Sequence, residues 1–262
     1  MNKIAFIGMG NMGKALLKGA LKSMSNDRFM FADKVLSEEI INEYGVYGTT
    51  DNAECAKEAK YIFLAVKPQF FGNVVEDIKD YMTEDKVVIS IMAGINIDKI
   101  KASLGNVRVV RVMPNTPALV EAGMSGVCFD NSDYQDEEKK VVFEILESCG
   151  IIKTVDESLM SAVTCVSGSS PAYVYMFIEA LADSAVKYGL PRNTAYEMAA
   201  QTVLGAAKMV LETGKVPAEL KDMVCSPAGT TIAGVAALEE YGFRNAIIKA
   251  TDNCYKRAEE LK

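Results

Sequence analysis

The feature that most constrains the fold of this chain is a glycine pattern close to its start. Residues 3–13 read KIAFIGMGNMG, an apolar run that leads directly into G-x-G-x-x-G, with glycines at Gly8, Gly10 and Gly13. A helix-forming stretch follows, and an acid, Asp33, ends the next apolar run at the distance expected of a ribose-binding carboxylate. Such glycines permit a tight turn, close approach of the backbone to a pyrophosphate, and tight packing of helix on strand. The pattern therefore predicts a dinucleotide site.

Composition limits the other classes of protein that this chain can be. It has 262 residues, of which 50% are hydrophobic and 24% charged, and these values predict a globular protein of one large or two ordinary domains. The net charge of −7 and the lack of a Lys/Arg cluster argue against a nucleic-acid partner. No apolar run has membrane-spanning length, and the start lacks the long apolar region of a signal peptide. We therefore expect no membrane association and a cytoplasmic location.

The chain contains no histidine, which removes several kinds of chemistry. Ser-His-Asp and Cys-His catalysis and His-ligated metal sites are excluded, and we predict no metal site. The six cysteines are scattered without a C-x-x-C pair, which favours reduced thiols over a disulfide framework. Any reaction must use hydroxyls, lysines, carboxylates, backbone groups or a cofactor.

The first part of the chain, to about residue 156, alternates strand-like and helix-like segments. The strand candidates are apolar on both faces, as in parallel strands that are covered by helices on both sides. They are Ile4–Ile7, Phe29–Ala32, Tyr61–Val66, Val87–Ile91, Val107–Val112 and Ile151–Val155. An Asp51-Asn52 cap signal opens one of the intervening helices. The pattern predicts an α/β fold with a doubly wound parallel sheet.

Residues 157–262 are predicted to be helical throughout. Proline and glycine positions predict helices over 171–187, 217–225, 231–240 and 243–261, and a capping box, Thr194–Glu197, predicts another to about 212. The segment Pro171–Lys187 is apolar nearly all round, so it must be buried. Burial against a second copy of the chain predicts an obligate dimer; the alternative is the core of a single-chain bundle.

Two motifs follow predicted strands at the sheet edge where ligands bind in open α/β folds. Ala65, Val66, Lys67 and Pro68 end one strand, and we expect this turn to face the cofactor. Lys67 is explained equally well as a solvated loop lysine. Met113–Pro117 ends another strand with two prolines in a stiff loop that suits a nicotinamide pocket; the alternative is an ordinary proline-rich turn.

Two segments in the helical part combine small residues with hydroxyl groups ahead of a predicted helix. They are Val166–Tyr173, with three serines and a glycine, and Ser226–Ile232. Free N–H groups and hydroxyls at the positive end of a helix dipole make a site for an anion. Simple N-capping needs only one such residue, so two such segments beside a dinucleotide domain predict a carboxylate substrate.

These motifs together give a family resemblance that runs nearly the whole length of the chain. The chain resembles pyrroline-5-carboxylate reductase in the segments Phe6–Gly13, Ala65–Pro68, Arg111–Pro117, Ser167–Tyr173, Leu220–Asp222 and Ser226–Thr231. The glycine pattern is common to many dehydrogenases, whereas the later motifs are much more specific.

The resemblance implies reduction of a cyclic imine to L-proline by NADPH or NADH. It also implies a Rossmann domain over 1–156, a helical dimerisation and substrate-binding domain over 157–262, and a homodimer that assembles further into a decamer of five dimers. Thr231 is then the catalytic hydroxyl near the imine nitrogen. The implied substrate-binding residues are Ser167, Ser169, Ser226, Gly229, Thr230 and Thr231. The implied cofactor-binding residues are Gly8, Gly10, Asn11, Met12, Gly13, Asp33, Lys34, Asn52, Ala65, Val66, Lys67, Pro68, Asn115 and Thr116.

The chain departs from the family pattern at two positions. Ala228 stands where the family often has glycine, and it is strained if that position needs a positive φ. Asp33 favours the free 2′-hydroxyl of NAD over the 2′-phosphate of NADP, while the neighbouring Lys34 offsets this effect. The preference between the two cofactors stays open at this point.

Two other functions compete with pyrroline-5-carboxylate reduction. Another imine reductase, or a β-hydroxyacid reductase, of similar architecture relies on a lysine or acid in the first long helix of its second domain, and Pro171–Lys187 offers Glu179 and Asp183 but no lysine in its middle. A carrier or sensor that binds the dinucleotide without turnover would not need the two segments rich in hydroxyl groups. Family membership does not by itself prove catalysis.

Overall fold

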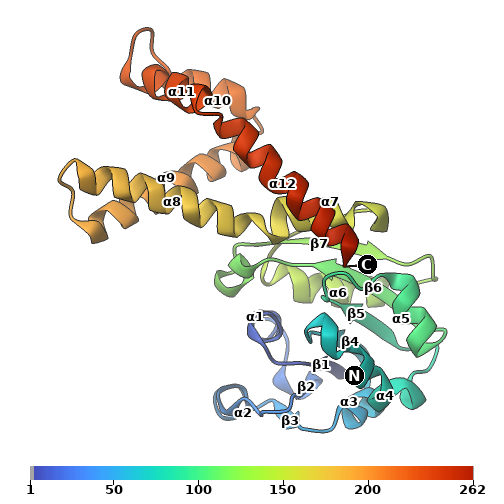
Figure 1. Cartoon of the computed structure of the whole chain (residues 1–262). Helices are drawn as coiled ribbons and strands as arrows, with labels where there is room; N and C mark the ends of the chain where they lie inside the picture. Colours follow the sequence, from blue (N-terminus) through green and yellow to red (C-terminus); the bar gives the residue numbers. More distant parts are fainter. Residues whose placement is uncertain (1–2, 262) are drawn as a thin grey trace. The chain divides into compact units, whose positions relative to one another are not determined.

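The computed structural model describes residues 3–261, which form two compact units (Figure 1). The chain passes from the first unit to the second between Ser169 and Ser170, and it rejoins the first at Cys254. The first unit is a sheet covered by helices, and residues 170–253 form helices and their connections. The domain boundary predicted between residues 156 and 157 follows the change in sequence pattern rather than compactness, and it stays a prediction.

The sheet of the first unit has eight strands in the order β3-β2-β1-β4-β5-β6-β7-β8. Neighbouring strands are parallel except β6 and β7, which are antiparallel. The order runs outward from β1 in both directions, so the predicted doubly wound architecture is confirmed. The strands are β1 (Lys3–Ile7), β2 (Phe29–Ala32), β3 (Tyr47–Thr49), β4 (Ala59–Leu64), β5 (Val87–Ser90), β6 (Arg108–Met113), β7 (Gly123–Phe129) and β8 (Gly150–Thr154).

All six predicted strands are present, with small shifts at their ends, but β3 and β7 were not predicted. β3 is too short to give a pattern, and β7 contains two glycines and a serine, which weaken a strand signal. The expectation of an entirely parallel sheet was therefore wrong at β7. The connection from β6 to β7 holds only the short helix η4 (Thr116–Val120), whereas a parallel strand needs a longer crossover.

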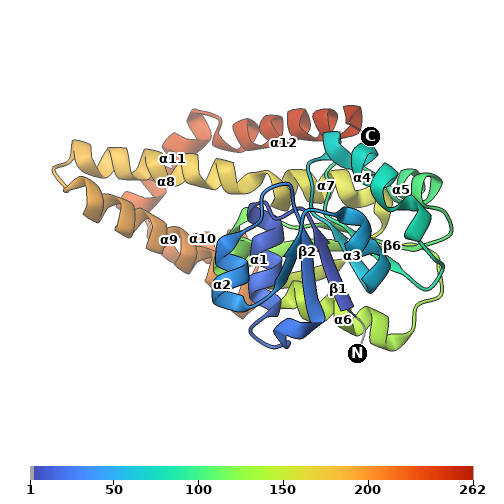
Figure 2. The same cartoon turned by 90° about the horizontal axis from the view of Figure 1, so that it is seen from below.

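Helices cover both faces of the sheet (Figure 2). One face packs against α1, α2 and α6, and the other against α3, α4 and α5. Their bounds are α1 (Asn11–Ala20), α2 (Glu38–Tyr44), α3 (Asn52–Glu58), α4 (Phe71–Ile78), α5 (Ile97–Leu104) and α6 (Asp136–Glu147). The predicted cap of α3 is confirmed, because the Asp51 carboxylate accepts a hydrogen bond from the Ala53 N–H at 2.9 Å.

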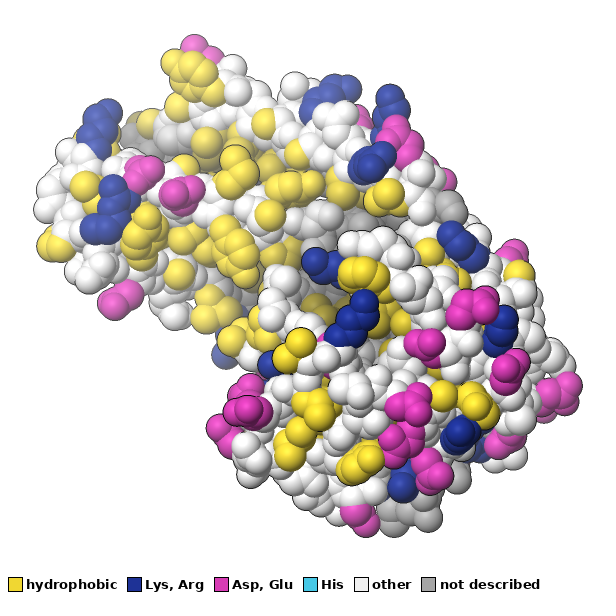
Figure 3. All heavy atoms as spheres, turned by 60° about the horizontal axis from the view of Figure 1, so that its bottom comes forward, with side chains coloured by type: hydrophobic (Ala, Val, Ile, Leu, Met, Phe, Trp, Pro, Cys, Tyr) yellow, Lys and Arg dark blue, Asp and Glu magenta, His cyan; other side chains and the backbone are white. Residues whose placement is uncertain are grey.

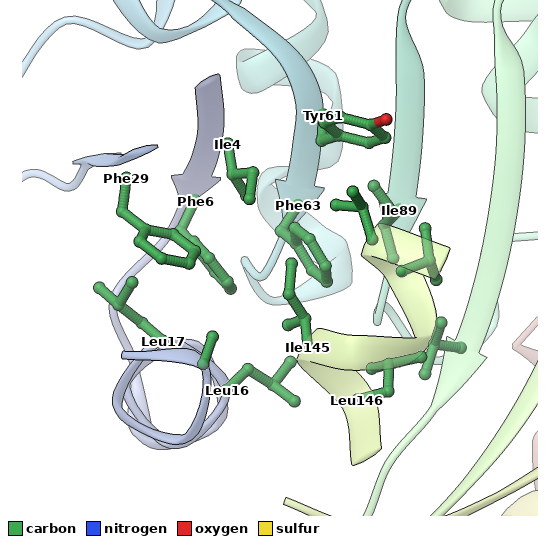
Figure 4. Packing of buried hydrophobic residues seen from close by; sticks show 14 of the residues in the cluster. Ile4, Phe6, Leu16, Leu17, Phe29, Tyr61, Phe63, Ile89, Ile145 and Leu146 are labelled. Carbon is green, nitrogen blue, oxygen red and sulfur yellow. The ribbon is translucent and has the colours of Figure 1, made fainter. Parts of the chain in front are cut away.

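Each face of the sheet has its own hydrophobic core, because successive strand residues point to opposite sides. Figure 4 shows the core beneath α1 and α6, where the rings of Phe6 and Phe63 stack with 4.5 Å between their centroids. Leu16 and Leu17 of α1 and Ile145 of α6 close over these rings. This core fixes the position of α1 on β1, and hence that of the glycine loop between them.

The cysteines are free thiols throughout residues 3–261, as predicted. Four are buried, and Cys225 and Cys254 are half-buried. Burial raises the pKa of the Cys55 thiol to about 12, which leaves it protonated and unreactive at neutral pH.

The helical elements of the second half include all five that were predicted, with shifts at some of their ends, and two that were not predicted, which precede the others. They are α7 (Met160–Val163), a π-helical turn (Thr164–Gly168), α8 (Ser170–Lys187), α9 (Arg192–Thr213), α10 (Pro217–Val224), α11 (Thr230–Glu240) and α12 (Phe243–Glu260). Gly214 ends α9 with φ +65°, as expected of a C-terminal glycine.

The predicted start of α9 was wrong by three residues. The helix begins at Arg192 and its N-cap is Pro191, whose carbonyl accepts a hydrogen bond from the Ala195 N–H at 3.0 Å. The fixed φ of proline suits this position, so the helix starts there and Thr194–Glu197 lies inside its first turns rather than capping it.

The helical unit leaves most of its apolar surface exposed. Its buried hydrophobic residues within 170–253 are Ala182, Ala195 and Ala199. On α8 the exposed fraction is 59% for Tyr175 and 68% for Met176, and Figure 3 shows hydrophobic side chains gathered over this unit. Among residues 3–261 we find no helix with both the length and the apolarity needed to cross a membrane. An apolar surface of this extent marks an interaction face.

Candidate active site

In the glycine loop between β1 and α1, two of the three glycines have no room for a side chain, and the third borders open space. A Cβ on Gly8, which has φ +99°, would lie 2.8 Å from the backbone of Ala65, and one on Gly13 would lie 2.4 Å from the Gly8 carbonyl oxygen. A Cβ on Gly10 would meet nothing within 4 Å. Gly8 and Gly13 are therefore required by the fold, whereas at Gly10 the backbone borders open space that a pyrophosphate can fill.

The N-terminus of α1 faces the same loop and is not capped by a side chain. Its N-cap is Gly10, which makes no side-chain hydrogen bond to the first turn. The first N–H groups of a helix have no partner within it, and they carry the positive end of its dipole. The loop and the helix start thus fit a dinucleotide phosphate.

A cavity of about 380 Å³ lies beside this loop and brings together most of the predicted cofactor residues. The predicted residues that line it are Gly8, Gly10, Asp33, Lys34, Asn52, Ala65, Val66 and Lys67. Asn11, Met12, Gly13 and Pro68 adjoin them in the chain without lining the cavity. The remaining two, Asn115 and Thr116, follow β6.

Besides Ile7 and Ala32, which end β1 and β2, four residues that line the cavity were not predicted to bind the cofactor. Phe70 belongs to the short helix η2 (Pro68–Phe70), and Asn73, Val74 and Asp77 belong to α4. Their only signal in the sequence was their place just after the Ala65–Pro68 turn. The helical period then sets which of them face inward, since residues three and four apart share a face.

Four of the polar side chains of the cavity, those of Asp33, Lys34, Asn52 and Asp77, are held by the backbone or by other side chains of the cavity. Asp33 accepts hydrogen bonds from the N–H groups of Met9 and Val35, and the Asn52 amide donates to the Asp77 carboxylate at 2.9 Å. The Lys34 ammonium lies 5.3 Å from the centre of the Phe70 ring, a cation–π contact. The cavity is therefore built before any ligand enters.

The first of the two segments rich in small polar residues is not a helix start, and this corrects the prediction. The helix continues from α7 through the π-helical turn into α8. The Ser167 hydroxyl donates to the Val163 carbonyl at 2.9 Å, and the Ser169 N–H donates to the Thr164 carbonyl at 2.8 Å. The Cys254 thiol donates to the Ser169 hydroxyl at 3.2 Å. The Ser167 hydroxyl and the Ser169 N–H therefore serve the helix itself.

Asn115 has a role that its position after β6 did not reveal. Pro171 has no N–H to give the Ser167 carbonyl four residues earlier, and the Asn115 amide donates to that carbonyl at 3.0 Å. The Asn115 side-chain oxygen accepts from the Met124 N–H at 2.9 Å. The buried Asn115 side chain thus joins the start of α8 to β7, and it does not line the cavity. Thr116 beside it is exposed.

The second segment, Ser226–Thr231, leads into a helix start as predicted. Gly229 is the N-cap of α11 and makes no side-chain hydrogen bond to the first turn. The Gly229 N–H donates to the Ser226 carbonyl at 3.0 Å, which closes a tight loop. Within this loop Ala228 has φ +54°, so the positive φ considered from the sequence is present at a residue with a Cβ. Ser226 and Thr230 are exposed and Thr231 is half-buried.

Both the N-terminal and the C-terminal part of the chain match known protein families. Residues 157–261 match the pyrroline-5-carboxylate reductase dimerisation family, and residues 3–94 match the family described as NADP oxidoreductase, coenzyme F420-dependent. The chain is 46% identical over 266 residues to the pyrroline-5-carboxylate reductase of Escherichia coli (strain K12), across 99% of this chain and 98% of the relative. It belongs to the pyrroline-5-carboxylate reductase family.

Solved structures of pyrroline-5-carboxylate reductases have the same fold. The reductase from Coxiella burnetii superposes with a TM-score of 0.92 at 35% identity, covering 100% of this chain and 98% of that one. The Plasmodium falciparum enzyme, solved with NADP bound, gives a TM-score of 0.89 at 33% identity, covering 99% and 98% of the two chains. As a member of this family the protein is an NAD(P)H-dependent oxidoreductase that acts on an imine.

Proposed function

We propose that the protein reduces 1-pyrroline-5-carboxylate to L-proline, with the substrate carboxylate bound at the start of α11. The uncapped first turn behind Gly229 is the observation that carries this assignment. Its N–H groups and the hydroxyls of Ser226, Thr230 and Thr231 are donors at the positive end of the helix dipole, where a carboxylate is stabilised. Ser167 and Ser169, whose donors serve the helix, are expected to contribute through shape rather than through free N–H groups.

The missing histidine suits this reaction. A protonated cyclic imine is already electrophilic, so the protein needs mainly to orient its imine carbon, a proximity effect. NAD(P)H, when bound, supplies the hydride. Thr231 holds the imine nitrogen and passes a proton to it, or solvent supplies that proton. The glycine loop and the cavity beside it bind and orient the dinucleotide.

The assembly that we propose is a homodimer formed through the helical unit. The exposed side chains of α8, among them Met176, and the match of residues 157–261 to a dimerisation family support it. A decamer of five such dimers is the larger assembly that family resemblance suggests. The cytoplasm is the compartment proposed for it.

Replacing Thr231 tests the assignment of the catalytic hydroxyl. Thr231→Ala is expected to lower kcat by about 100-fold or more, since a positioned proton-transfer group typically contributes about 10²–10⁴-fold, and to leave the Kd for NADH unchanged. Thr231→Ser is expected to keep most of the activity. The matched control is Thr202→Ala, which removes an exposed hydroxyl bonded to its own helix backbone in α9.

The measurement is steady-state oxidation of NADH and NADPH with pyrroline-5-carboxylate, and with a β-oxo acid, which a β-hydroxyacid reductase would reduce, as the control substrate. Unchanged kinetics in Thr231→Ala would remove this residue from the site. Absence of turnover with the imine in the unmodified protein would overturn the proposed reaction, whatever the behaviour of the variants.

A further inference from the structure

The cavity beside the glycine loop contains a fixed acid where a dinucleotide places its adenosine ribose. Asp33 follows directly after β2, and its side chain points to the glycine loop. In this fold an acid at the end of the second strand accepts hydrogen bonds from the ribose hydroxyls, whereas enzymes that bind NADP place an arginine nearby for the 2′-phosphate. The surroundings of Asp33 therefore decide which of the two cofactors fits.

The Asp33 carboxylate is held in place on both of its oxygens. Oδ2 accepts from the Met9 N–H at 2.5 Å, and Oδ1 accepts from the Val35 N–H at 3.3 Å. Its own N–H donates to the Thr49 carbonyl at 3.2 Å, which ties the residue to β3. A carboxylate offers about four acceptor positions, so the two that remain can accept from ribose hydroxyls. The residue cannot turn away to admit a phosphate without losing its bonds to the glycine loop.

The cations near Asp33 are poorly suited to offset its charge. Among the described residues that line the cavity, the positive side chains are Lys34 and Lys67, and none is an arginine. The Lys34 ammonium is engaged over the Phe70 ring. A second acid, Asp77, lies on the opposite wall and takes the Asn52 amide as its hydrogen-bond donor. A bidentate donor for a phosphate is therefore not provided here.

We propose that this enzyme prefers NADH and that Asp33 is the residue that rejects the 2′-phosphate of NADPH. The phosphate brings a charge of roughly −1.5 to −2 and only acceptor oxygens toward a carboxylate, so repulsion replaces the hydrogen bond from the 2′-hydroxyl. The proposal deepens the proposed function and rests on it only for dinucleotide binding. A binding measurement without the imine therefore tests it separately from the reaction.

The test is calorimetric titration of the unmodified protein with NADH and with NADPH, at low and at high salt. We expect NADPH to bind at least about 10-fold more weakly at low salt, and the difference to shrink at high salt because salt screens the repulsion. Equal binding of the two cofactors, or tighter binding of NADPH, would overturn the proposal without any variant.

The Asp33→Asn variant tests whether Asp33 is the residue that rejects the 2′-phosphate. Its amide oxygen can still accept a hydrogen bond from the Met9 N–H, while the charge is removed. The ratio of the NADPH Kd to the NADH Kd is expected to fall about 10-fold, with the NADH Kd changing less than about threefold. Asp77→Asn, which removes the other acid of the cavity, is the matched control and is expected to leave the ratio unchanged. A ratio that responds to Asp77→Asn and not to Asp33→Asn would contradict the assignment, and thermal unfolding shows that each variant is folded.

Discussion

The two units of this protein bury their apolar residues in different ways. The sheet unit packs both faces of its strands beneath helices of the same chain, and side chains such as Phe6 and Phe63 are fully buried. The helical unit is equally apolar in sequence, yet Tyr175 and Met176 of α8 stay largely exposed. The first unit covers its own apolar residues, whereas the second exposes apolar surface that its own helices do not cover.

This difference shows that an apolar pattern predicts burial but not the partner that provides it. Strands that are apolar on both faces need helices on both sides, and this chain supplies them. A helix that is apolar nearly all round needs neighbours on every side, and the helices of its own unit leave much of α8 uncovered. We therefore assign dinucleotide binding to the sheet unit, which covers its own apolar residues, and assembly to the helical unit, which does not.

The largest effect is expected from a charge placed on the uncovered surface of α8. Met176→Glu should weaken dimerisation by roughly 1000-fold, because an unpaired charge would have to be buried in the interface, and activity should be lost with the dimer. Binding of NADH to the sheet unit should survive. Sedimentation velocity measures the assembly and nicotinamide fluorescence measures the binding.

Ile151→Glu is the matched control for that change, since Ile151 is also exposed but belongs to β8 of the sheet unit. The control variant should remain dimeric. A dimeric and active Met176→Glu variant would show that α8 is not covered by a second copy, and the contrast between the units would then need another explanation.

A smaller effect, confined to the sheet unit, is expected at the glycine loop. Gly13→Ala forces a Cβ to within 2.4 Å of the Gly8 carbonyl oxygen, so the loop must move and NADH binding should weaken by roughly 100-fold. Gly10→Ala has open space for its Cβ, so the fold should keep its melting temperature while binding still weakens. Both variants should remain dimeric. Calorimetric titration measures the affinity for NADH, and thermal unfolding measures the melting temperature. Loss of the dimer in either variant would mean that the two units are not independent.

The smallest effect is expected at Ala228, in the loop before α11. A non-glycine residue with positive φ is destabilised by about 1–2 kcal/mol, and glycine loses about 0.5–1 kcal/mol more chain entropy on folding. Ala228→Gly should therefore raise the free energy of unfolding by about 0.5–1 kcal/mol. Ala233→Gly, within α11, is the control and should lower it by about 1 kcal/mol. Thermal unfolding followed by circular dichroism measures both, and a destabilised Ala228→Gly variant would show that the loop is not strained.

Local features of the chain were sufficient to predict the glycine loop, six of the strands, and the places where most helices begin and end. Gly8 needs its positive φ, and Gly13 avoids the Gly8 carbonyl, for reasons that lie within a few residues. Gly214 ends α9 in the same local way, and Pro191 starts it, three residues before the predicted capping box. Apolar runs of strand length likewise need little context.

The tertiary structure alone decided the features that join distant residues. The Asn115 amide replaces the N–H that Pro171 lacks, so a segment that reads as a helix start lies within a continuous helix. The antiparallel position of β7 in the sheet, and the presence of Asp77 in the lining of the cavity, also depend on contacts between residues far apart in the chain. The sequence by itself determined the dinucleotide fold, because glycine conformation, helix ends and apolar period are local properties, and the resemblance carried by its motifs implied the reaction class. It could not determine which donors remain free for a ligand, since a hydrogen bond between distant residues has no local signature.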